Sequence, residues 1–133
     1  MDVTFPCLAL EKGILVLAGV YNIRCDQGST FQRVITVTHS VSGNTYEPVD
    51  LTGYTARMQI RKKFGGTVLI ELTTDIDGGI TLDEANGIVT VEMTAEQTAS
   101  IDRSGVYDLE LVVGQTVTKI LRGQFILNHE VTT

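Results

Sequence analysis

Apolar and polar side chains alternate strictly between positions 54 and 61. The apolar positions of this run are Tyr54, Ala56, Met58 and Ile60. A period of two is typical of a β-strand with one face in the core and the other in water. The loop that follows contains Gly65-Gly66, a pair that tolerates the positive φ angles of a tight turn. The pattern therefore predicts a hairpin, with strands over residues 54–61 and 67–72.

Turn signals separate further short apolar runs. Residues 80–82 and 88–93 flank a segment that ends in Asn86-Gly87, a strong signal for a second hairpin. Thr94 and Gln97 have the spacing of a capping box, which predicts one or two helical turns near residues 95–101. Strands are also expected over residues 14–23, 31–38 and 106–113. A final strand over 117–127 should be bulged near Gly123, because apolar residues there occupy both faces.

Seven or so strands joined by short turns indicate an all-β fold, either a β-sandwich or a barrel. Long helices do not alternate with the strands, which argues against a parallel α/β sheet. Strand parity also predicts which side chains share the core. These are Ala56, Met58, Ile60, Val91, Leu109 and Leu111.

The first twenty residues differ from the rest because they contain an apolar run without polar alternation. We expect residues 21–133 to form a single β-sandwich domain. Residues 1–20 are either a first strand with a packed terminus or an arm that docks on a neighbouring subunit. The candidate contact residues of this segment are Phe5, Pro6, Leu8, Leu10, Ile14, Leu15 and Leu17.

Length and charge narrow the class of protein. A chain of 133 residues is the size of one domain with a substantial core. Sixteen acidic against ten basic residues leave a net charge of −6, which argues against nucleic acid or an anionic membrane as the partner. The apolar run 14–20 is too short to span a bilayer and has an acidic flank, so we expect synthesis in the cytoplasm.

The sequence offers few groups for catalysis or metal binding. His39 and His129 lack the partners of a triad or a metal motif. Asp75 and Asp77 have the spacing of a calcium loop, but the third ligand position and the closing glutamate are missing, so we expect an ordinary acidic turn. We therefore expect no catalytic residue, no metal site, no cofactor and no enzymatic activity.

Two other features leave alternatives open. Cys7 and Cys25 are too few for a metal cage, and we expect them to be reduced, with a single bridge between them as the alternative. The first hairpin tip carries Lys62, Lys63 and Phe64, which we take as candidate contact residues. Basic residues at such a tip also serve simply to keep a sheet edge soluble.

Four stretches of the chain together resemble one family. They are residues 21–31 (YNIRCDQGSTF), 49–61 (VDLTGYTARMQIR), 80–82 with 88–91 (ITL and IVTV), and 105–111 (GVYDLEL). Over residues 21–127 the chain resembles small Ig-like β-sandwich domains of tailed-bacteriophage virion proteins, similar to the N-terminal domain of baseplate upper proteins. The resemblance implies an Ig-like antiparallel β-sandwich, and it places no catalytic residue on this chain.

The resemblance also implies a function. Such a domain often anchors a longer chain, whereas this one ends at Thr133, which implies a separate baseplate or tail adaptor, or a fibre-attachment subunit. Its partners would be tail, baseplate, fibre or capsid proteins, and it would form a homo-oligomer in the virion after synthesis in the host cytoplasm. The alternatives are a capsid decoration protein or a receptor- or carbohydrate-binding module. The aromatic platform of such a module would be Tyr21, Tyr46 and Phe64.

Overall fold

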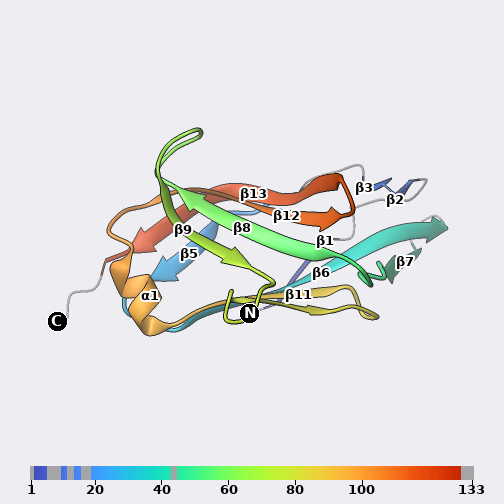
Figure 1. The fold of residues 1–133 in the computed structure, drawn as a ribbon, viewed down its shortest axis with the longest axis horizontal. Helices are drawn as coiled ribbons and strands as arrows, with labels where there is room; N and C mark the ends of the chain where they lie inside the picture. The colour runs from blue at the N-terminus through green and yellow to red at the C-terminus, as the bar shows by residue number, and fades with distance from the viewer. Residues whose placement is uncertain (1, 6–9, 12–13, 16–18, 43–44, 130–133) are drawn as a thin grey trace.

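The computed structural model describes residues 2–5, 10–11, 14–15, 19–42 and 45–129 (Figure 1). It is 61% strand and 6% helix, and all of its described strands except β2 and β3 form two facing sheets. One sheet lies above the other in Figure 1, and the short helix α1 (Ala95–Ser100) lies at one end of the two layers. The predicted all-β sandwich with a short helical turn is confirmed.

The first sheet is built around one long strand, β6. Its order is β1 (Asp2–Phe5), β6 (Phe31–Ser42), β11 (Ile88–Met93) and β10 (Ile80–Asp83), with β7 (Thr45–Pro48) also paired to β6. Strand β1 is parallel to β6, and the other pairings of this sheet are antiparallel. Residues 2–5 therefore extend a sheet of their own chain.

The second sheet contains the first predicted hairpin and the final strands. Its order is β4 (Gly19–Val20), β13 (Thr116–Asn128), β12 (Gly105–Val113), β8 (Thr55–Arg61) and β9 (Val68–Thr73), with β5 (Ile23–Asp26) also paired to β13. Strands β4 and β5 are parallel to β13, so the sandwich is antiparallel except at its edges. A separate two-stranded sheet joins β2 (Leu10–Glu11) and β3 (Ile14–Leu15).

The core lies between the two sheets and has the composition that strand parity predicted. The six side chains assigned to it are all at least 97% buried and belong to one cluster. Phe125 and Leu51 are also fully buried there. The local alternation of the chain is thus sufficient to identify the inner faces of β8, β11 and β12.

The bulge of the last strand lies at Ile120, three residues before the expected position. Leu109 pairs with Leu121 and Glu110 pairs with Lys119, so Ile120 is the extra residue. Ile120 and Leu121 are both fully buried, which explains why apolar residues occupy both parities there. Gly123 instead allows the chain at Tyr21 to approach β13 closely, because a Cβ on residue 123 would lie 2.3 Å from the carbonyl oxygen of Tyr21.

The single strand expected over residues 14–23 is wrong. Strand β3 ends at Leu15, β4 covers Gly19–Val20, and β5 begins only at Ile23. Between β4 and β5 the chain interacts with β13 in a different way: the Tyr21 amide donates to the Arg122 carbonyl at 2.9 Å. The Asn22 side chain accepts a hydrogen bond from the Gln124 amide at 3.0 Å. One main-chain bond and one bond to a side chain thus replace the regular ladder with β13 at this point.

Candidate functional site

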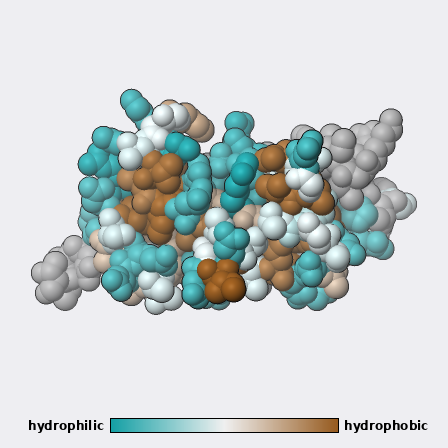
Figure 2. All heavy atoms as spheres, in the orientation of Figure 1, coloured by the Kyte–Doolittle hydropathy of each residue, from teal (hydrophilic) through white to brown (hydrophobic). Residues whose placement is uncertain are grey.

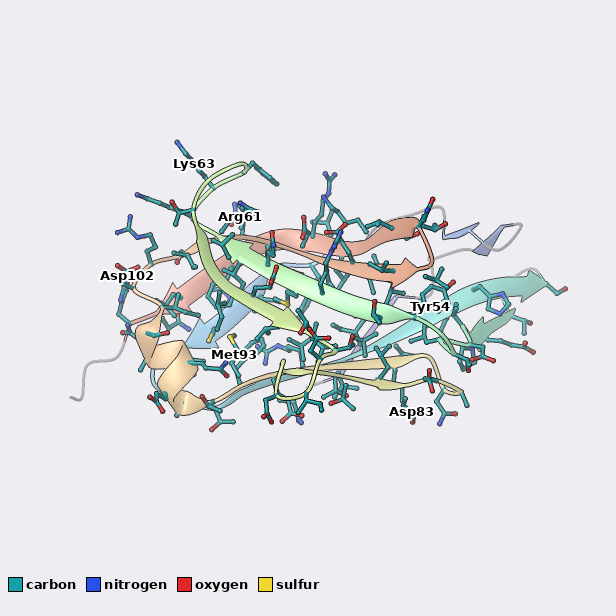
Figure 3. The ribbon with its side chains drawn as sticks, in the orientation of Figure 1. Tyr54, Arg61, Lys63, Asp83, Met93 and Asp102 are labelled. Carbon is teal, nitrogen blue, oxygen red and sulfur yellow. The ribbon has the colours of Figure 1, made fainter. Side chains whose placement is uncertain are left out.

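The loop between β8 and β9 projects from the end of the second sheet (Figure 1). It carries Lys62, Lys63 and Phe64, which are all exposed, and we call these three residues the basic tip. Phe64 has 77% of its surface exposed, an unusual state for a large aromatic ring. Lys63 points away from the molecule in Figure 3, whereas Arg61 lies at the base of the loop. The structure thus brings together three of the contact residues proposed from sequence.

Hydrogen bonds fix the shape of the basic tip. The Lys62 amide donates to the Thr67 carbonyl at 3.0 Å, and the Gly66 amide donates to the Lys63 carbonyl at 2.8 Å. Arg61 donates from Nη1 to the Gly66 carbonyl at 2.7 Å, and its Nε and Nη2 donate to Gln59. The Arg61 charge is therefore used to hold the loop, and the charge presented to a partner comes from the two lysines.

The two lysines have different surroundings. The pKa of Asp102 is held below its usual value mainly by the hydrogen bond from Arg103. The positive charge of Lys62 lowers the pKa of Asp102 further, so Lys62 interacts electrostatically with an acidic residue of its own chain. The ion pairs among the described residues are Arg57–Glu110, Arg103–Asp102 and Lys119–Asp108, and none of them includes Lys63. Lys63 therefore offers an uncompensated positive charge beside the exposed ring of Phe64.

A groove of about 940 Å³ lies at the opposite end of β9, where the edges of the two sheets approach each other. Its walls come from β10, β11, the start of α1 and the β9–β10 loop, and Tyr54 and Met93, which are labelled in Figure 3, are among its lining residues. We call it the acidic groove. Among the described residues that line it, the charged ones are Asp75, Asp77, Glu84 and Glu92, and none is a lysine, arginine or histidine.

Main-chain hydrogen bonds fix the shape of the β9–β10 loop, which forms one wall of the groove. The Thr73 amide donates to the Gly78 carbonyl at 2.9 Å, and the Gly78 amide donates to the Asp75 carbonyl at 2.8 Å. Ile76 lies between two aspartates and is 94% exposed. Figure 2 shows a hydrophobic protrusion at the lower edge of the molecule, where this loop lies in Figure 1. The loop therefore presents an apolar side chain framed by negative charges.

The residues considered for metal binding or catalysis do not converge. In the described ranges, no three or more His, Cys, Asp or Glu side chains are grouped so that they could hold a metal ion. His39 lies in β6 opposite Glu47 of β7, whereas His129 follows the end of β13. Asp77 takes a φ of 62° inside the tight turn that the loop makes. Asp75 and Asp77 therefore belong to a loop with a defined main-chain structure.

Cys25 is buried and has a free thiol, whereas Cys7 lies outside the described residues. Burial raises the pKa of the Cys25 thiol to about 11; the nearby Arg33 charge opposes this rise, and Asp26 adds to it. Arg33 lies over the ring of Phe31, 4.6 Å from its centroid, and donates to the Arg24 carbonyl at 2.8 Å. The hydrogen bond from Arg33 thus links β6 with β5. The buried Cys25 thiol has low reactivity, because it is the ionised thiolate that reacts.

The other proposed contact residues are less informative. Phe5, Leu10, Ile14 and Leu15 lie in the short strands β1, β2 and β3, and Pro6, Leu8 and Leu17 lie outside the described residues. In the aromatic platform, Tyr21 is half-buried and packs against the core, while Phe64 is exposed. Tyr46 lies in β7, opposite Ser40.

Sequence reasoning missed the acidic groove. Its charged residues come from the β9–β10 loop, the β10–β11 turn and β11, and only the fold places Glu84 and Glu92 beside Asp75. The run Asp75-Ile76-Asp77 was a local signal, because it leaves an isoleucine in a polar turn.

Comparisons with models of protein families and with curated proteins find no match to this chain. Among the described residues, no helix is long and apolar enough to cross a membrane.

Proposed function

We propose that this chain is a non-enzymatic structural protein of a tailed-bacteriophage virion. It acts as a baseplate or tail adaptor, or as a fibre-attachment subunit, through protein–protein contacts. Its partners are other tail, baseplate, fibre or capsid proteins, and it assembles as a homo-oligomer in the virion after synthesis in the host cytoplasm. A net charge of −6 supports proteins over nucleic acid as partners.

The motif residues behind the family resemblance have structural roles in this fold. Asp50 accepts hydrogen bonds from the Thr52 amide at 2.9 Å and from its hydroxyl at 2.6 Å, and Gly53 takes a φ of 84° in the same turn. Gln27 donates to the Ile101 carbonyl at 2.9 Å, and Phe31 is buried in the core. These residues build turns and a core, which is what a scaffold of this family requires.

The observation that carries the proposal is the basic tip. It holds the exposed ring of Phe64 on a loop that Arg61 and the Gly66 amide keep in one shape. Aromatic rings on ordered surfaces are typical anchors of protein–protein interfaces, because a rigid side chain loses little entropy when a partner covers it. The exposed ring also matches the carbohydrate-binding alternative, so a test must separate the two.

The direct test is quantitative mass spectrometry of purified phage particles. We expect the protein in every particle, in the few copies that tail symmetry allows and in the tail fraction after particles are disrupted. A copy number that matches the capsid lattice would instead favour a decoration protein. Binding of the isolated protein to host-wall polysaccharide, without a place in the particle, would favour the carbohydrate-binding module. Absence from particles overturns the proposal.

A further inference from the structure

The basic tip and the β9–β10 loop have complementary arrangements. In the first, an exposed phenylalanine follows two lysines; in the second, Ile76 lies between Asp75 and Asp77. Each therefore combines an apolar side chain with charges of one sign. The basic tip protrudes, whereas the acidic groove is hollow. Shape, charge and apolar character are thus matched between two surfaces of one chain.

These two surfaces cannot meet within one molecule. They lie at the two ends of β9, whose six residues span about 20 Å at the usual rise of a strand. Hydrogen bonds to the Gly66 and Thr67 carbonyls hold the tip at one end of β9, and the bond from Thr73 to Gly78 holds the loop at the other. A contact between tip and groove therefore requires two molecules.

We propose that the basic tip of one copy docks into the acidic groove of a second copy. Lys63 and Lys62 lie against the carboxylates of Asp75, Asp77 and Glu92, all exposed residues. Phe64 packs beside Ile76 and the ring of Tyr54, which lines the groove. The occupant is a copy of this chain because the tip supplies positive charges opposite in sign to those of the groove and an exposed ring that can pack on Ile76 and Tyr54.

A contact of this kind is heterologous, since it joins two different surfaces of identical subunits. In a pair joined this way one copy keeps an unused groove and the other keeps an unused tip, so further copies add until a ring closes or an open chain forms. The inference rests on the proposed function in taking the tip as an assembly contact, and it adds the identity of the partner. A ring made in this way suits an adaptor that encircles a tail axis.

The first test is sedimentation velocity of the purified full chain over a range of concentrations. We expect the chain to associate at low salt. At high salt its dissociation constant should be about tenfold higher, because salt screens the exposed charges that contribute much of the binding free energy. A chain that remains monomeric at all concentrations overturns the inference. Association that does not respond to salt overturns it as well.

The second test exchanges the charges. Lys62→Glu with Lys63→Glu reverses the charge of the tip. Asp75→Lys, Glu84→Lys and Glu92→Lys together reverse the charge of the groove, because three of its four acidic lining residues become basic. Each of the two variants alone should be monomeric, because its tip and its groove then carry net charges of the same sign. An equimolar mixture of the two should associate again, since the tip of each fits the groove of the other.

The matched control is Arg24→Glu with Arg122→Glu, which changes the net charge as much as the tip variant does at exposed sites in β5 and β13. It should associate like the wild type. If it becomes monomeric, or if the mixture of charge-exchanged variants stays monomeric, the specific contact is refuted. Phe64→Ser provides a variant without charge change and should weaken association about tenfold.

The outcomes separate this inference from the proposed function. A protein present in particles but monomeric in solution refutes the tip-to-groove contact and leaves the virion role standing. A protein that associates through the tip and groove but is absent from particles retains the contact and refutes the virion role.

Discussion

Met58 shows how strongly a single position in this sandwich is constrained. It is 1% exposed and lies in β8 between Leu109 of β12 and Leu72 of β9. We expect Met58→Asp to unfold the domain, because an unpaired buried carboxylate costs several kcal/mol against a total stability of about 5–15 kcal/mol. Circular dichroism and urea denaturation test this.

The control is Thr55→Asp, at an exposed position of the same strand, which should remain folded. A Met58→Asp variant that melts cooperatively near the wild-type temperature would contradict the prediction.

Cys25 should make the stability of the protein depend on pH in alkaline solution. Its thiol ionises near pH 9 in an unfolded chain, whereas burial raises its pKa to about 11 in the fold. Between these values the unfolded state loses the proton that the folded state keeps, so stability is complete below pH 9 and falls as pH rises to 11. Tyr107 acts in the same direction at still higher pH, because burial also raises its pKa.

Urea midpoints measured from pH 8 to pH 11 in the presence of reductant test this dependence. Cys25→Ala should lower stability at every pH and flatten the slope between pH 9 and 11. An unchanged slope in that variant would show that the thiol does not cause the alkaline loss.

At the level of elements, the side chains of Thr98 and Gln27 attach α1 to the β5–β6 turn, and only Thr98 belongs to the helix. Thr98 is fully buried; its hydroxyl donates to the Ser29 carbonyl at 2.8 Å and accepts from the Gly28 amide at 3.0 Å. The capping box that the sequence predicted is present at Thr94 and Gln97. The capping box stabilises the first turn of the helix, and the hydrogen bonds of Thr98 position the helix against the β5–β6 turn.

Thr98→Val should destabilise the protein by about 1–3 kcal/mol although it preserves side-chain shape. The cost arises because the Gly28 amide and the Ser29 carbonyl lose their hydroxyl partner. Denaturation by urea measures it, with Thr116→Val at an exposed site of β13 as the control. Equal stabilities of the two variants would show that these hydrogen bonds contribute nothing.

The contact between β4, β5 and β13 depends on the absence of a side chain at Gly123. A Cβ there would lie 2.3 Å from the Tyr21 carbonyl oxygen, which also accepts a hydrogen bond from the Tyr107 hydroxyl. We expect Gly123→Ala to destabilise the fold by about 1–3 kcal/mol and to push residues 19–26 away from β13.

Hydrogen exchange of the amides of residues 19–26 is the specific measurement for this variant, and exchange there should accelerate. Gly114→Ala is the comparison, because its Cβ would meet nothing within 4 Å and its strain comes from a φ of 57°. It should leave exchange in residues 19–26 unchanged. Accelerated exchange in both variants would point to general destabilisation and away from the close approach at Tyr21.

At the scale of the whole molecule, the N-terminal strand is an edge strand of the sandwich. Strand β1 pairs with residues 34–37 of β6 at the border of the first sheet. We expect deletion of residues 1–12 to leave a cooperatively folded domain, because β6 keeps its pairing with β11 and β7. The same deletion should abolish incorporation into particles, since an edge strand with apolar neighbours is suited to binding another subunit.

Thermal melting of the truncated chain and mass spectrometry of particles assembled with it test the two halves of this prediction. An insoluble truncation would assign the segment to the intramolecular core. Normal incorporation would refute its role in assembly and leave the basic tip and the acidic groove as the contact surfaces.

Local patterns in the amino-acid sequence are enough to predict the all-β class, the inner faces of several strands and several turns. Alternation in β8 identifies Met58 as buried, and Asn86-Gly87 marks the β10–β11 hairpin. These features are local, because the side-chain period of a strand and the φ preferences of a turn depend on residues a few positions apart. For the same reason the basic tip, which lies within one hairpin loop, was recognisable as a candidate contact from sequence.

Which strands are neighbours, and which sheet edges meet, became known only from the folded molecule. The bulge at Ile120, the parallel pairing of β4 and β5 with β13, and the attachment of β1 to β6 depend on contacts between distant segments. The acidic groove depends on them most, since Asp75, Glu84 and Glu92 converge only after the edges of both sheets come together. Such pairings are set by the packing of the whole core, whereas the spacing of residues along the chain does not encode them.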